Sequence, residues 1–171
     1  MNEILIILAL ILLNGLFSMS EIALISARKS RLSSDAKKGD KGAKTALDMS
    51  EQPDKFLSTV QIGITLIGIL TGIFSGAAVA TELSHWLQSF GISMGYAMTI
   101  AQTAIVIIVT YLTLVFGELL PKRIGMSMSE KIAKMMSRPM NLLSKIVSPF
   151  VLLLSGSTSM LFKLMGLKDG N

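Results

Sequence analysis

The sequence predicts an all-α integral membrane domain, and three observations support this prediction. Apolar residues make up 51% of the 171 residues, whereas charged residues make up only 16%, against about 25% in soluble domains. The mean hydropathy is correspondingly high, at +0.62. Three stretches without Lys or Arg reach the length of about 20 residues that crosses a bilayer. We therefore expect one transmembrane domain over residues 1–171, with three spans.

The three spans are predicted at about residues 4–27, 56–80 and 97–120. Residues 28–55 are expected to form a connector, with a Gly-containing break at 38–42 and a helix over 43–51. Residues 81–96 are expected to form a loop on the opposite side, where Trp86 and Tyr96 would anchor at the interface. A cleaved signal peptide is not expected, because Glu3 is acidic and the first apolar stretch is too long.

The distribution of basic residues predicts the orientation in the cell membrane. Of the 16 Lys and Arg residues, eight lie in 28–55 and eight follow the third span. Basic residues are enriched in cytoplasmic loops, so the N-terminus is expected outside and the C-terminal region in the cytoplasm. The net charge of +5 is then explained by topology, and nucleic acid is not an expected partner.

Residues 121–171 are expected to form amphipathic juxtamembrane helices at the cytoplasmic surface of the bilayer. The segment 146–154 is apolar, but Pro149 interrupts it and Lys145 and Lys163 flank it. A fourth span or a re-entrant segment over about 140–165 is the alternative.

The residue inventory excludes several kinds of chemistry. The chain has no Cys and one His, so thiolate chemistry and a multi-His metal site within one chain are excluded. No Ser/His/Asp set or nucleotide-binding loop is found, and an enzyme is not expected.

Two carboxylates lie within the predicted spans, at Glu21 and Glu118, both toward the cytoplasmic end. Charged side chains at membrane depth are costly and usually face an ion, a partner or a cavity. Asn14, Ser18 and Glu21 share one helix face, and oxygen ligands of this kind suit a hard cation. Hydrogen bonding between helices is an equally good explanation for this stripe.

The third span ends in the segment GELLPK at 117–122. Pro121 has no N–H, and its ring clashes with the carbonyl of Gly117 four residues earlier. We therefore predict a helix break at Pro121 and a released carbonyl beside Glu118, as in the broken helices with which many transporters bind cations. The alternative is an ion pair between Glu118 and Lys122, with Pro121 simply ending the helix.

Glycines in the second span suggest two roles. Gly68, Gly72 and Gly76 recur every fourth residue and predict close helix packing, within or between protomers. Gly63 lies nearer the cytoplasmic end and is a candidate for a local break with an exposed carbonyl.

Four segments, taken in order, resemble the transmembrane domain of the CorC/cyclin-M (CNNM) family. They are NGLFSMSEIAL at 14–24, QPD at 52–54, LSTVQIG at 57–63 and GELLPK at 117–122. The resemblance implies a homodimeric Mg²⁺ transporter, generally an exporter, with Na⁺ entry as a candidate driving force. It also implies cytoplasmic juxtamembrane helices and, in longer chains, CBS domains, which are absent from these 171 residues.

The resemblance places a dehydrated Mg²⁺ in a cytoplasm-facing cavity, with Ser18 and Glu118 as the ligands that carry over best. The full candidate site comprises Ser18, Ser20, Glu21, Gly63, Gly117 and Glu118. Ile64 stands where many relatives have Asn, which puts ion identity in question. A membrane anchor or a Mg²⁺-sensing module that does not transport is the alternative function.

Overall fold

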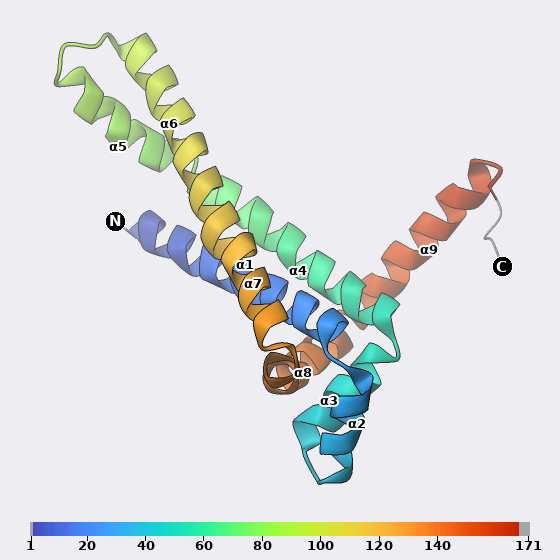
Figure 1. The fold of residues 1–171 in the computed structure, drawn as a ribbon. Helices are drawn as coiled ribbons and strands as arrows, with labels where there is room; N and C mark the ends of the chain where they lie inside the picture. Colours follow the sequence, from blue (N-terminus) through green and yellow to red (C-terminus); the bar gives the residue numbers. More distant parts are fainter. Residues whose placement is uncertain (1, 168–171) are drawn as a thin grey trace.

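The computed structural model describes residues 2–167, without the side chains of residues 77 and 78. All regular elements in this range are helices (Figure 1). The all-α prediction is confirmed.

Three candidate spans confirm the predicted layout. The first is α1 (Asn2–Ser26). The second is α4 (Pro53–Phe74), which continues into α5 (Ala77–Gln88). The third is α6 (Met94–Leu114), which continues through the π-helical turn η1 (Val115–Leu119) into α7 (Leu120–Ser127).

The prediction of a loop over residues 81–96 is wrong for most of its length, because α5 extends to Gln88 and α6 begins at Met94. Helices α5 and α6 form a hairpin that turns at Gly91, whose φ of +90° favours glycine. Ala80 and Ser84 on α5, and Ala97 and Ala101 on α6, are almost fully buried. These small side chains let the two helices approach closely. The aromatic residues on which the loop prediction rested give no sign of this contact.

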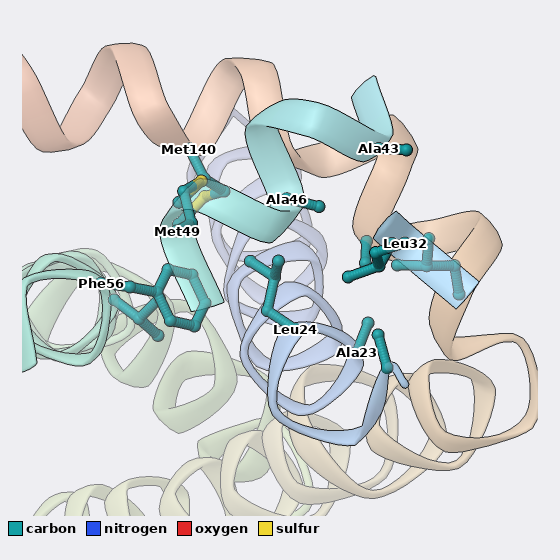
Figure 2. Packing of buried hydrophobic residues seen from close by; sticks show 12 residues of the cluster. Ala23, Leu24, Leu32, Ala43, Ala46, Met49, Phe56 and Met140 are labelled. Atoms are coloured by element: carbon teal, nitrogen blue, oxygen red, sulfur yellow. The ribbon is translucent and has the colours of Figure 1, made fainter. Parts of the chain in front are cut away.

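The opposite end of the spans is capped by α2 (Lys29–Lys37), α3 (Lys41–Ser50) and α8 (Ser129–Ile146). Figure 2 shows the buried cluster between them and the ends of α1 and α4, which includes Leu24, Leu32, Met49, Phe56 and Met140. This cluster holds α8 against the ends of the spans. The arrangement of the spans therefore depends on the packing of α2, α3 and α8, and the reverse also holds.

Helix α3 starts where the sequence predicted a break. Gly39 adopts a φ of +99°, and the Asp40 carboxylate caps the new helix by accepting a hydrogen bond from the backbone N–H of Ala43 at 3.0 Å. A Cβ at Gly42 would lie 2.6 Å from the carbonyl oxygen of Lys134. Only glycine therefore allows α3 and α8 to pack this closely.

An ion pair between Lys134 and Asp35 joins α8 to α2. The hydrogen bond from Lys134 holds the pKa of the Asp35 carboxyl below its ordinary value. The same bond raises the pKa of Lys134. Because the pKa of Asp35 is lower in the folded state, the pair stabilises the fold above the unfolded value of about 3.9. That stabilisation is lost as pH falls through the folded pKa.

We therefore expect Asp35→Asn to flatten the acid limb of the stability profile. The thermal midpoint of the wild type should fall more steeply than that of the variant between about pH 5 and pH 3. Asp48→Asn is the control, because Asp48 is exposed on α3. Equal slopes for the wild type and Asp35→Asn would show that the pair does not stabilise the fold.

The last two helices differ from one another in character. Helix α8 buries one face and exposes the other, as expected for an amphipathic juxtamembrane helix. Helix α9 (Ser148–Leu164) buries only Val151 and exposes apolar side chains all round, so it lacks the polar face expected of an amphipathic helix. It follows α8 at a bend of 67° and points away from the bundle (Figure 1). The pair is apolar enough to form a broken span or a re-entrant segment.

Candidate functional site

The third span changes its hydrogen-bond pattern over η1, immediately before Pro121. The N–H of Leu120 donates to the carbonyl of Val115, five residues earlier. Because Pro121 has no N–H and its ring crowds the carbonyl of Gly117, the wider turn relieves the clash without ending the helix. The chain stays helical to Ser127, so the break predicted at Pro121 is a change of helix type. Such turns are frequently found at functional sites.

The carbonyl of Gly117 is bound by a side chain of another span. Asn14 Nδ2 on α1 donates a buried hydrogen bond of 2.8 Å to the Gly117 oxygen. Asn14 itself is only 4% exposed. A released backbone oxygen at membrane depth needs such a partner. From the sequence, Asn14 was predictable only as a member of a polar stripe.

Small residues bring α1 and the third span into close contact on both sides of this bond. Gly117, Pro121 and Gly125 recur every fourth residue along the third span, facing α1. A Cβ at Gly15 would lie 2.8 Å from the carbonyl oxygen of Phe116 and 3.0 Å from Pro121 Cγ. A Cβ at Gly125 would lie 2.8 Å from the carbonyl oxygen of Met19. We call these residues the α1–α7 seam (Gly15, Gly117, Pro121, Gly125).

The two candidate serines occupy different positions on α1. Ser18 is 1% exposed and lies one turn beyond Asn14, on the same helix face. Ser20 is fully buried, and its hydroxyl donates to the carbonyl of Leu16 at 2.7 Å within α1. Because a hydroxyl binds a cation through its oxygen lone pairs, the proton that Ser20 donates within α1 does not exclude it, and both serines remain candidate ligands.

The two carboxylates are both partly buried. Glu118 lies in η1, beside Gly117, and within residues 2–167 it forms no ion pair with Lys122. Glu21 lines a cavity of about 730 Å³ between α1, α4 and α9. Ser58, Gln61 and Thr65 add polar groups to this cavity, and Glu118 is not among its lining residues.

Gly63 serves packing in this structure. A Cβ there would lie 2.7 Å from the ring of Phe17, so the glycine makes room for an aromatic side chain of α1. Helix α4 is continuous from Pro53 to Phe74, and the local break considered at Gly63 is not found.

Gly68 and Gly72 do not pack closely within this chain, since a Cβ at either would have no neighbour within 4 Å. A Cβ at Gly76, between α4 and α5, would approach only the carbonyl oxygens of Ile73 and Gly72 on α4, at 3.4 and 3.5 Å. Gly68 and Gly72 instead line a cavity of about 340 Å³ between α1, α4 and α6. Asn14 and Thr113 also line it, and the buried Thr113 Oγ1 has no hydrogen-bond partner.

The donor set suits a cation held mainly by neutral oxygens. No group of three His, Cys, Asp or Glu side chains gathers anywhere in the described part of the chain. The oxygen donors that the sequence predicted on α1 and η1 are the Ser18 hydroxyl, the Gly117 carbonyl and the Glu118 carboxylate. Oxygen-only ligand sets of this kind favour Mg²⁺ and similar hard ions over soft metals.

Replacing Asn14 by Leu is expected to destabilise the domain by about 1–3 kcal/mol, because the Gly117 carbonyl would be left buried without a partner. Thermal unfolding in detergent measures the change. Thr103→Val is the control, because that exposed hydroxyl donates only within α6, to Thr99. An Asn14→Leu protein as stable as the wild type would show that the bond is dispensable.

Comparison with known proteins places this arrangement in a family. The chain is 47% identical over 165 residues to the UPF0053 protein sll0260 of Synechocystis sp., covering 96% of this chain. It is 35% identical over 167 residues to the polyamine export protein of Escherichia coli K12, covering 98%. It is 29% identical over 170 residues to the UPF0053 protein YhdT of Bacillus subtilis, covering 99%. The chain spans 37% of the length of each of these relatives.

The family description that matches is the cyclin M transmembrane N-terminal domain, over residues 5–171. The match includes all three candidate spans, the η1 turn and the helical cap. This chain therefore belongs to the cyclin M (CNNM) transmembrane domain family.

Proposed function

We propose that this membrane domain transports a cation, which binds beside the η1 turn. The observation that carries the proposal is the Gly117 carbonyl, which is released from the α-helical pattern by Pro121 and belongs to the residue before Glu118. In the structure the amide of Asn14 occupies this oxygen at 2.8 Å. A cation arriving at Glu118 would compete with that amide for the same oxygen, so binding would couple to the contact between α1 and the third span.

Mg²⁺ is the first candidate cargo. Its support is the oxygen-only donor set of Ser18, Gly117 and Glu118, which suits a hard divalent ion. The basic residues of α2, α3 and α8 favour the cytoplasm for the capped end, and export driven by Na⁺ entry belongs to the same proposal. So do the homodimer and the CBS domains of a longer chain.

An organic polyamine is the second candidate cargo. The relative from Escherichia coli is named a polyamine export protein. The Glu21 cavity combines one carboxylate and several hydrogen-bond acceptors with apolar walls, which include Leu57, Ile62, Leu66 and Ile69. A polyamine alternates ammonium groups with methylene chains. Its ammonium groups would bind the carboxylate of this cavity, and its methylene groups would bury apolar surface against the walls.

Reconstituted flux tests the proposal. Proteoliposomes loaded with Mg²⁺ or spermidine, with and without an inward Na⁺ gradient, would be compared with protein-free vesicles. Release of either cation supports transport, and the cation released identifies the cargo. Binding of Mg²⁺ without release of either cation would contradict transport and support a sensing module.

A further inference from the structure

The outward face of α8 combines an apolar stripe with a row of basic residues. The apolar stripe consists of Met128, Met135, Leu142 and Ile146, which are 45–63% exposed. The basic row consists of Lys131, Arg138 and Lys145, all exposed and spaced seven residues apart. Seven residues make nearly two helical turns, so the row runs along the helix beside the apolar stripe. We call the two together the α8 outer face.

The basic row carries charge that the protein does not neutralise. Lys134, one turn away, pairs with Asp35 and lies 3.8 Å from Asp40. By contrast, Lys131, Arg138 and Lys145 form no ion pair in residues 2–167. These cations therefore remain available to a ligand outside the chain.

A groove of about 970 Å³ continues the α8 outer face toward α2. Arg31 and Lys41 join Lys131 and Arg138 along its walls, and Met128 and Met135 provide apolar surface. The groove also contains acidic groups: Asp35 and Asp40 face Lys134, and Glu130 accepts a hydrogen bond from Ser129 at 3.1 Å. Five basic and three acidic side chains line the groove, so its net charge is +2.

Helix α8 lies at the end of the spans, where the boundary of the bilayer is expected. Helix α8 packs against α1 and α4, close to where α1 ends at Ser26 and α4 begins at Pro53. Apolar side chains beside basic ones at this depth are typical of helices that lie in the headgroup region and attract anionic lipids.

We propose that the α8 outer face binds anionic phospholipids, with Lys131, Arg138 and Lys145 contacting phosphate groups and the apolar stripe entering the acyl region. This inference concerns the lipid partner and is independent of which cation the domain transports. Each cation near an anionic surface contributes about 1 kcal/mol, so three should give roughly 100-fold tighter binding of anionic than of zwitterionic lipid.

Lipid titration of the detergent-solubilised protein tests the proposal. The thermal midpoint would be followed against phosphatidylglycerol, phosphatidylcholine and inorganic phosphate. The test variant is Lys131→Gln/Arg138→Gln/Lys145→Gln. The control is Lys29→Gln/Lys37→Gln/Lys38→Gln, which removes the same charge from exposed positions on or beside α2.

The wild type and the control should be stabilised by phosphatidylglycerol at roughly 100-fold lower concentration than by phosphatidylcholine, whereas the test variant should lose this preference. A preference that survives in the test variant, or that falls equally in the control, would overturn the proposal. Equal stabilisation by inorganic phosphate would also overturn it, because the groove would then be a site for soluble anions.

Discussion

Gly125→Ala is expected to destabilise the domain by about 1–3 kcal/mol, the cost of overpacking a tight contact. The added methyl group would lie 2.3 Å from Ile22 Cγ2 and 2.8 Å from the backbone oxygen of Met19. The side chain of Ile22 could rotate, but the backbone oxygen belongs to α1 and cannot move alone. The variant must therefore separate α7 from α1. This separation would also disturb the hydrogen bond from Asn14 to Gly117, two turns earlier along the third span.

The matched control is the same change at Gly156, an exposed position inside α9. A Cβ there has no neighbour within 4 Å, so Gly156→Ala should stabilise the helix by about 0.5–1 kcal/mol. Unfolding of both variants in detergent would be followed by thermal denaturation. If the two substitutions had the same effect, the seam would not be a stabilising contact.

Glu118→Gln is expected to reduce cation flux on the order of 10-fold or more, the factor that a loss of about 1.4 kcal/mol of binding would produce. The substitution preserves the size of the side chain and removes the charge beside the Gly117 carbonyl. A carboxylate attracts a cation most strongly where little water screens its charge, and Glu118 is partly buried in η1. Flux into or out of proteoliposomes measures the effect.

Two further variants make this result specific. Glu82→Gln changes an exposed carboxylate on α5 and should leave flux unchanged. Glu21→Gln separates the two candidate cargoes: loss of spermidine flux with Mg²⁺ flux intact would assign the Glu21 cavity to the polyamine. Wild-type flux in Glu118→Gln would remove Glu118 from the site.

The spans were predictable because apolar length is a strong signal, and all three lie close to the predicted positions. The α5–α6 hairpin was missed because its contact is made by Ala80, Ser84, Ala97 and Ala101, which carry little hydropathic signal. Helix α9 was expected to be amphipathic because lysines flank it, whereas its exposed apolar residues surround the helix. Whether it lies on or in the membrane stays a prediction.

The release of the Gly117 carbonyl followed from local chemistry, because proline acts on the residue four positions earlier. Its partner could not be predicted, since Asn14 lies 103 residues away. The spacing of Gly117, Pro121 and Gly125 was readable in the sequence but was overlooked, because a helix break was expected at Pro121. Similar predicted depth did not place the two carboxylates together: Glu21 lines the cavity between α1, α4 and α9, and Glu118 is not among its lining residues.

Cation binding at Glu118 is the most direct test of the proposed function. Purified protein would be titrated with Mg²⁺, Na⁺, Ca²⁺ and spermidine, and its thermal midpoint followed beside Glu118→Gln and Glu82→Gln. A ligand that binds only the folded state raises stability with concentration. We predict a selective, saturable rise with Mg²⁺ in the wild type and Glu82→Gln, and none with Mg²⁺ in Glu118→Gln, whereas a spermidine response from the Glu21 cavity should persist in Glu118→Gln. A rise with Mg²⁺ that is unchanged in Glu118→Gln, or no rise with any cation in folded wild-type protein, would contradict a cation site at this turn.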